Sequence, residues 1–115
     1  MKKLIYLASP YSHKTTDVIE KRFKQVAETT AKLMIEGYYI FSPILNSHYL
    51  SITHGLAGDW NYWKTFDELI ISKCAELWVL KIDGWQESVG VSAEIKIAEE
   101  FNLPVKYIEY DGNIT

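Results

Sequence analysis

Short apolar runs alternate with longer amphipathic segments along this sequence. Four of these runs predict β-strands at residues 3–8, 38–41, 76–82 and 105–108. The first run is apolar on both faces, which is typical of a central strand in a parallel sheet. Each gap between successive runs has room for a helix, so the pattern predicts strands and helices in alternation.

The first helix is expected to begin at Thr16 or Asp17 and to continue to about Glu36, with Gly37 suited to the position after its end. Residues at helical spacing form its apolar stripe: Ile19, Phe23, Val26, Ala27, Thr30, Leu33 and Met34. Segment 44–57 shows no comparable period, so we expect a looser structure there.

Two more helices are expected in the second half of the chain. Asp59 is suited to cap one of them, and Ser88 or Gly90 can open the other, which continues to about Asn102. Leu103-Pro104 then ends that helix, because proline cannot continue it.

Alternating strands and helices predict an α/β fold, here a three-layer αβα arrangement around a flavodoxin-like parallel sheet of four to five strands in the order 2-1-3-4. In such sheets ligands bind beyond the carboxyl ends of the strands, where the strand order reverses. That point lies between the first and third strands. We therefore expect substrate contacts from Ser9, Pro10, Tyr11, Asp83 and Ser88.

Two carboxylates interrupt apolar helical stripes. Glu94 lies three residues after Val91 and four before Ala98, and Phe101 continues that stripe. Asp67 shares a helix face with Trp60, Trp63, Ile70, Ile71 and Cys74. A carboxylate that faces a core is costly unless it is paired or used.

Two half-buried carboxylates beside one crevice suit the cleavage of a glycosidic bond. Glu94, near a helix N-terminus, is expected to stay ionised as a nucleophile must. Asp67 is its candidate partner, and Tyr6, in the middle of the first strand, could hydrogen-bond to either.

Length and composition narrow the choice of partners. The 115 residues suit one domain, which we expect to span residues 1–115. A net charge of −3 gives no reason to expect a nucleic-acid polymer or a membrane as partner. With no secretory signal and no stretch long enough to span a bilayer, we expect a cytoplasmic location.

Metal and disulfide chemistry find little support in the sequence. Cys74 is the only cysteine, which excludes an intramolecular disulfide and a cysteine-based zinc site. His13, His48 and His54 do not have the spacing of metal ligands. Neither a metal nor an organic cofactor is expected.

Taken together, these residues resemble the nucleoside 2-deoxyribosyltransferase superfamily, and within it a small subfamily of bacteria and phages. The matching pieces are residues 5–7, Asp67 with residues 69–70, and residues 88–95, which read Ser-Val-Gly-Val-Ser-Ala-Glu-Ile. The resemblance implies that Glu94 is the nucleophile, Asp67 the catalytic aspartate and Tyr6 the residue that positions the glutamate.

Ser88 carries the expectation about substrate. Superfamily members that act on free nucleosides usually have an aspartate there, whereas the 2′-deoxynucleoside 5′-monophosphate N-hydrolases have a serine. The resemblance thus implies a phosphate at the helix N-terminus, which Gly90 would let approach closely. Two departures concern the substrate more than the fold: Ser9-Pro10 replaces the usual glycine of the first loop, and Glu76 replaces an aspartate before the third strand.

The predicted function is cleavage of the N-glycosidic bond of nucleoside 5′-monophosphates, preferably deoxyribonucleotides, through a covalent glycosyl-glutamate intermediate. Hydrolysis and base transfer both remain open, as does the identity of the base. The alternative is a nucleotide-binding or sensing module without turnover, and a third option is a structural oligomeric protein. A homodimer or larger homo-oligomer is expected, with segment 44–63 at or near the interface.

Simpler roles are open for individual residues. Ser88 could be only an N-cap, Asp67 could pair with Lys64 or Lys73 on the helix surface, and Glu94 could cap a backbone amide. His48 could touch a base or a phosphate, or be a solvated loop histidine. Three tryptophans are expected in packing or at an interface, and at least one of them could stack on a nucleobase: Trp60, Trp63 and Trp85.

Overall fold

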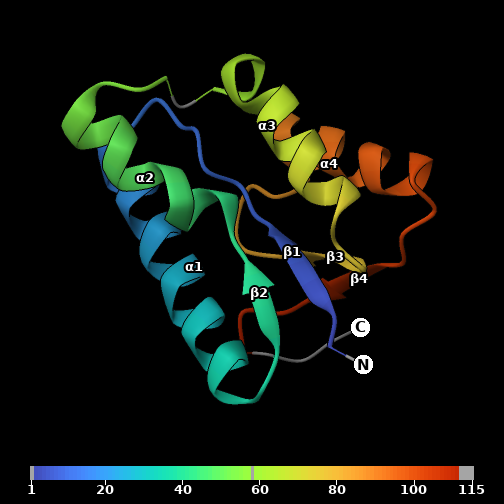
Figure 1. Ribbon diagram of the computed structural model, residues 1–115. Coiled ribbons are helices and arrows are strands. Elements are labelled where there is room, and N and C mark those ends of the chain that lie inside the picture. The colour runs from blue at the N-terminus through green and yellow to red at the C-terminus, as the bar shows by residue number, and fades with distance from the viewer. Residues whose placement is uncertain (1, 58, 112–115) are drawn as a thin grey trace.

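A parallel sheet lies between helices in the computed structural model, which describes residues 2–57 and 59–111 (Figure 1). The elements in chain order are β1 (Leu4–Ala8), α1 (Thr16–Ile35), β2 (Tyr39–Phe41), α2 (Pro43–His54), α3 (Trp60–Ser72), β3 (Glu76–Leu80), α4 (Val89–Glu100) and β4 (Val105–Ile108).

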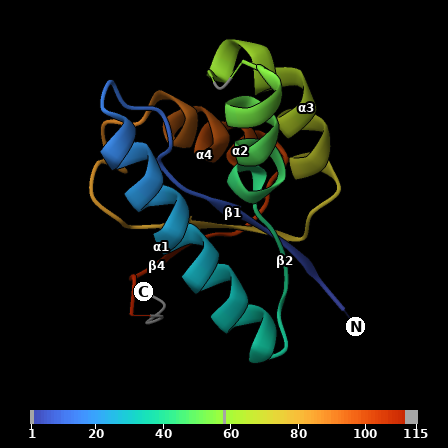
Figure 2. The same ribbon diagram turned by 90° about the vertical axis from the view of Figure 1, so that its left-hand side faces the viewer.

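The sheet has four strands in the order β2-β1-β3-β4, and every neighbouring pair is parallel. This confirms the predicted α/β fold and strand order. Helix α1 covers one face, while α3 and α4 lie side by side on the other (Figures 1 and 2). Because β1 and β3 are neighbours, with Ala8 opposite Val79, the loops that follow them meet at one edge of the sheet.

Alternation along the strands divides the core into two layers. The layer on the α1 side contains Ile5, Leu7, Val26, Leu33, Ile40, Ile44, Trp78, Leu80, Ile82 and Ile108. The layer under α3 and α4 contains Tyr6, Ala8, Ile71, Cys74, Leu77, Val79, Val91, Ile97 and Ala98. Cys74 thus packs as a small apolar residue, and burial raises the pKa of its thiol to about 11.

Segment 44–57 is mostly helical, so the expected looser structure was wrong. The Ser42 side chain accepts a hydrogen bond from the Leu45 amide, and Pro43 occupies the first turn. Gly55 ends the helix with a left-handed conformation, at φ 75°. Local capping chemistry therefore defines α2 where hydrophobic periodicity does not.

Two residues assigned to buried stripes are exposed. Met34 is 53% exposed and Phe101 is 46% exposed. Met34 is the last residue but one of α1, and Phe101 is the C-cap of α4. The periodicity of each stripe is correct, but helix ends need not be covered by the sheet.

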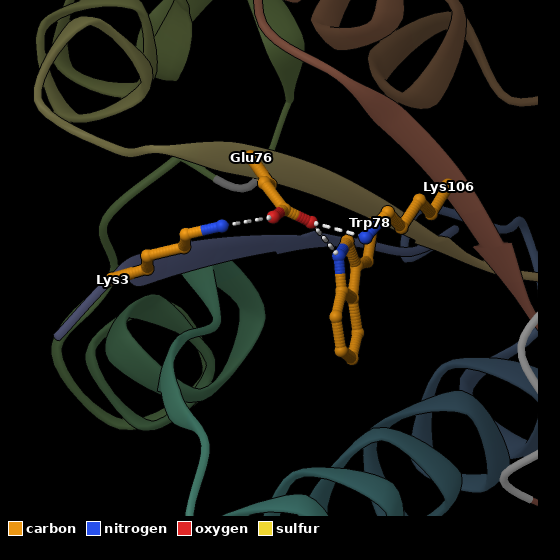
Figure 3. A network of polar contacts seen from close by, with 4 residues as sticks. All are labelled: Lys3, Glu76, Trp78 and Lys106. Carbon is orange, nitrogen blue, oxygen red and sulfur yellow. Dashed lines mark hydrogen bonds and ion pairs between the residues drawn. The ribbon is translucent and has the colours of Figure 1, made fainter. Parts of the chain in front are cut away.

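Glu76 opens β3 and links this strand to β4 and to the residue before β1 at the amino end of the sheet (Figure 3). Its Oε1 accepts from Trp78 Nε1 at 2.9 Å and lies 3.1 Å from Lys106 Nζ, while its Oε2 lies 3.4 Å from Lys3 Nζ. The indole hydrogen bond, followed by the two lysines, lowers the pKa of Glu76. This carboxylate is a structural tie.

Candidate active site

Glu94, Asp67 and Tyr6 come together under α3 and α4. Glu94 lies on the buried stripe of α4 and is 4% exposed, and Asp67 lies on the buried side of α3 and is 5% exposed. Tyr6 points from β1 toward the same helices, and its hydroxyl donates a hydrogen bond to Glu94 Oε2. Three separate elements therefore build one polar cluster inside an apolar layer.

Burial dominates the protonation of this cluster. It raises the pKa of Glu94 to about 8, against the hydrogen bond from Tyr6 and with a further rise from the charge of Asp67. Burial also raises the pKa of Asp67, and the hydrogen bond with the Tyr6 hydroxyl offsets part of that rise, so that the resulting pKa is about 6. Burial also raises the pKa of Tyr6 well above its usual value. At neutral pH the two carboxyls together therefore hold about one proton.

The expectation that a helix N-terminus keeps Glu94 ionised is wrong for this structure. Helix α4 begins at Val89, so Glu94 lies beyond its first turn. The helix dipole acts mainly within that first turn, and the desolvation of a buried carboxylate outweighs it.

A cavity of about 420 Å³ opens at the carboxyl end of the sheet. Six residues predicted to carry chemistry line it: Ser9, Tyr11, Asp67, Ser88, Gly90 and Glu94. Ser9 Oγ and Asp67 Oδ1 are buried and have no hydrogen-bond partner. Such unsatisfied atoms in a cavity wall are suited to a polar ligand, because an unpaired buried polar group is costly.

Ser88 has a confirmed role as N-cap, since its Oγ accepts a hydrogen bond from the Val91 amide at 3.1 Å. This role leaves the hydroxyl proton available for a ligand. At Gly90 an added Cβ would meet Ser88 Oγ and Trp60 Cε3 at 3.9 Å, which is ordinary contact. Packing within the protein therefore does not require glycine at this position.

The remaining predicted site residues lie outside the cavity lining. Asp83 belongs to the loop after β3, which borders a separate polar hollow. Pro10 is fully buried, and Tyr6 lies behind Glu94. His48 was expected in a loop, but it is a buried residue of α2 whose ring reaches the cavity only through Tyr11.

Four lining residues lie near the start of α3, and two of them, Asp59 and Asn61, were not predicted to contact a ligand. Asp59, Trp60, Asn61 and Trp63 all line the cavity. Asp59 was identified only as a helix cap, which it is, because it accepts from the Tyr62 amide at 3.1 Å. The signal available was the density of aromatic and polar residues at a helix start that follows a glycine-containing loop.

The cavity is rich in negative charge. Four acidic side chains line it: Asp59, Asp67, Glu87 and Glu94. No lysine, arginine or histidine is among the described residues that line it. A group of three His, Cys, Asp or Glu side chains suited to a metal ion is absent from the described part of the chain. Across residues 2–57 and 59–111, no helix has the length and apolar character needed to cross a membrane.

The sequence and the structure were compared with those of known proteins. Residues 3–110 match the model of a family described as a domain of unknown function, DUF1937. No curated protein matches the sequence. The structure is similar to that of a 2-deoxyribosyltransferase from the psychrotolerant bacterium Bacillus psychrosaccharolyticus, with a TM-score of 0.64 and 23% identity over 97% of this chain and 76% of that one. The chain therefore belongs to the DUF1937 family, and the predicted resemblance to the nucleoside 2-deoxyribosyltransferase superfamily is confirmed in its fold.

Proposed function

We propose that this protein cleaves the N-glycosidic bond of a nucleoside-type substrate, with Glu94 as nucleophile. The observation that carries the proposal is the buried pair of Glu94 and Asp67, which opens into a cavity and is held by Tyr6. Carboxyls with separated pKa values are typical of glycosidic chemistry. The similar solved structure belongs to a 2-deoxyribosyltransferase described as a biocatalyst for nucleoside synthesis, which supports the same class of reaction.

The reaction proceeds in two balanced steps. In the first, a Glu94 oxygen forms a bond to the anomeric carbon, the bond to the base nitrogen breaks, and the base leaves with that electron pair and a proton from Asp67. In the second, water or another base attacks the same carbon, Asp67 takes up its proton, and the bond to Glu94 breaks. Tyr6 donates to Glu94 and orients it throughout.

The proton count of the free site suits this scheme, because one carboxyl must be ionised while the other carries a proton. In the free protein the pKa values of Glu94 and Asp67 favour the proton on Glu94. The reaction uses the opposite distribution. The Tyr6 hydrogen bond favours charge on Glu94, and the pair needs only to exchange one proton to reach the reactive form.

The charge of the lining bears on the 5′ end of the substrate. A 5′-phosphate carries about two negative charges at neutral pH. Ser88, Gly90 and the start of α4 offer it hydrogen bonds, but the four lining acids, which together hold only about one proton, repel it without a lining cation to compensate. The predicted monophosphate substrate thus stays a prediction, and the charges favour a free 5′-hydroxyl.

The decisive experiment is to incubate the protein with a panel of 2′-deoxynucleosides, ribonucleosides and their 5′-monophosphates and to measure free base by chromatography. We expect base release from at least one nucleoside, faster than from its monophosphate. A second base added to the mixture distinguishes transfer, which yields a new nucleoside, from hydrolysis. Absence of free base across the panel would contradict the proposal.

A binding module without turnover is the second candidate. The raised pKa of Glu94 favours it, because a protonated carboxyl is not a nucleophile. Calorimetric binding of nucleosides without any base release would establish this candidate instead of the first.

We also propose a homodimer or larger homo-oligomer. Apolar side chains lie exposed on α2 and α3: Tyr49, Leu50, Ile52, Tyr62, Phe66 and Leu69. Several belong to segment 44–63, next to the cavity, and rings of this kind are enriched at subunit interfaces. Light scattering at micromolar concentration is expected to give at least twice the mass of 13.3 kDa. A monomer mass would contradict the assignment.

A further inference from the structure

A chain of polar contacts runs from the cavity wall toward the protein surface. Tyr11 lines the cavity, and its hydroxyl oxygen lies 2.7 Å from His48 Nδ1. The other ring nitrogen, His48 Nε2, lies 3.2 Å from Glu20 Oε1. The three residues come from the loop after β1, from α2 and from α1, so the chain joins three separate parts of the fold.

The middle of this chain is held rigidly. His48 is 3% exposed. Its ring stacks on Phe23 with centroids 3.9 Å apart and planes at 19°, and it meets the Tyr11 ring edge-on at 84°. Arg22 also holds the Tyr11 loop, because its Nη1 donates to the Ser12 carbonyl at 2.9 Å. Tyr11 therefore has a defined orientation at the cavity wall.

The contact between His48 and Glu20 determines the direction of the hydrogen bond between Tyr11 and His48. The Glu20 carboxylate favours a proton on His48 Nε2, because its Oε1 lies 3.2 Å from this nitrogen and can only accept. In the neutral ring the other nitrogen, Nδ1, then has no proton and must accept. The Tyr11 hydroxyl accordingly donates to Nδ1. Burial, and then the charge of Glu20, raise the pKa of Tyr11, so its hydroxyl keeps that proton.

We propose that Glu20 and His48 act as positioning residues that make the Tyr11 oxygen a hydrogen-bond acceptor toward the cavity, and that it thereby selects a nucleobase with an amino group. This inference rests on the proposed function, since it places a nucleoside in the cavity. With its only proton committed to His48, the Tyr11 oxygen has lone pairs alone to offer a ligand.

The rest of the lining supports the same ligand chemistry. Asp59, Asp67 and Glu87 are acceptors when ionised, and no lysine, arginine or histidine is among the described lining residues. A ligand that offers N–H and O–H donors satisfies such a wall, whereas a ligand rich in carbonyl oxygens leaves acceptor facing acceptor. Amino-bearing bases therefore suit the cavity better than bases that lack the amino group.

The test measures binding without turnover. In the Glu94→Gln background, calorimetry gives dissociation constants for 2′-deoxyadenosine and for the purine 2′-deoxyribonucleoside without the 6-amino group. The same comparison is made for 2′-deoxycytidine and its analogue without the 4-amino group. We expect about tenfold tighter binding of the amino form in at least one pair, the size of one hydrogen bond.

Variants along the chain decide whether Tyr11 is responsible. Tyr11→Phe should bring that ratio to about 1, because the acceptor is gone while the ring remains. Glu20→Gln should lower it by roughly threefold, since a neutral amide no longer fixes the proton on Nε2. Glu28→Gln is the matched control, because Glu28 also lies on α1 and accepts from a tyrosine, Tyr110, but does not line the cavity. It should leave the ratio unchanged.

The outcomes separate this inference from the proposed function. A wild-type ratio near 1 in both pairs, or a ratio that survives Tyr11→Phe, would overturn the inference, while base release by the unmodified protein would still support glycosidic cleavage. Binding of none of the four nucleosides would overturn both. If Tyr11→Phe and Glu20→Gln change the melting temperature but not the ratio of dissociation constants, the contacts of Tyr11, His48 and Glu20 are structural only, which would also overturn the inference.

Discussion

Two carboxylate clusters at opposite ends of the sheet differ in one respect that decides their chemistry. Glu76 and Glu94 are 7% and 4% exposed, so a small exposed fraction does not distinguish them, but desolvation is the largest influence on the pKa of Glu94 and only a lesser one on that of Glu76. An indole N–H and two lysines contact Glu76 and lower its pKa. At Glu94 desolvation raises the pKa to about 8, the Tyr6 hydroxyl offsets only part of this rise, and the charge of Asp67 adds to it. A buried acid indicates a reactive site only when its charge is left uncompensated.

The difference also separates stability from function. The Glu76 cluster joins residues at the amino end of the sheet, and both carboxylate oxygens of Glu76 have partners (Figure 3). The Glu94 cluster leaves Asp67 Oδ1 unpaired beside an open cavity. The first arrangement stabilises the fold, while the second keeps an unpaired buried oxygen that a bound ligand can satisfy.

The largest expected effect is on turnover. Glu94→Gln keeps the shape of the side chain but removes the nucleophile, and should lower the rate of base release by at least about 10³-fold. Glu76→Gln is the matched control, because it alters an equally buried glutamate away from the cavity, and should retain activity within about threefold. Comparable losses in both variants would show that the two clusters do not differ in function.

Stability should respond to pH with opposite signs at the two clusters. The pKa of Glu94 is raised, so the native state binds more protons than the unfolded chain between about pH 4 and 8, and stability falls as pH rises through that range. Glu94→Gln should therefore unfold at a higher denaturant concentration than wild type at pH 9, with a free energy of unfolding higher by on the order of 5 kcal/mol. At pH 4 the two proteins should differ little.

The pKa of Glu76 is lowered, so its contribution is present above about pH 4.3 and is lost as pH falls through its native pKa. Glu76→Gln should destabilise the protein at pH 7 by roughly 1 to 2 kcal/mol, a value discounted because the side chains of Lys3 and Lys106 are 62% and 46% exposed. Urea titrations at pH 3 and 7 measure this contrast, and equal pH slopes in the two variants would refute it.

Turnover should have a bell-shaped pH profile, because the reactive pair holds one proton. With pKa values of about 6 for Asp67 and about 8 for Glu94, kcat/KM is expected to peak near neutral pH. Below the lower pKa and above the higher one, kcat/KM should fall by about tenfold per pH unit. Asp67→Asn should remove one limb. A profile that keeps rising from pH 6 to 9 would show that no proton on this pair is needed.

The smallest effect concerns the glycine at the cavity wall. Gly90→Ala should raise stability by about 0.5 kcal/mol, since alanine is the better helix former and its Cβ meets only ordinary contacts. The methyl group occupies ligand space, so KM should rise by several-fold.

Gly84→Ala is the contrasting variant. Its φ is +91°, and an added Cβ would lie 2.2 Å from Arg22 Nη2, so it should destabilise the protein by about 1 kcal/mol or more. Thermal melts of both variants measure the changes in stability, and saturation kinetics measure KM. Unchanged KM in Gly90→Ala would show that the ligand does not approach that backbone.

The hydrophobic pattern was sufficient for much of the fold. Four apolar runs predicted the strands, and alternation with helical stripes predicted their parallel order, because side-chain period and connection length constrain how such elements can pack. Helix α2 was missed because its ends are defined by Ser42, Pro43 and Gly55 rather than by a clear apolar stripe. Capping is encoded locally, but it is easily mistaken for loop composition.

The sequence by itself also predicted that Asp67 and Glu94 would face the core, because a carboxylate within an apolar stripe is visible from spacing alone. It could not determine which nearby groups surround each acid. Lys3 reaches Glu76 across 73 positions of the chain, and Tyr11 reaches His48 across 37. Protonation depends on desolvation and on charges close in space, and only the packing of α1, α3 and α4 on the sheet brings those groups together.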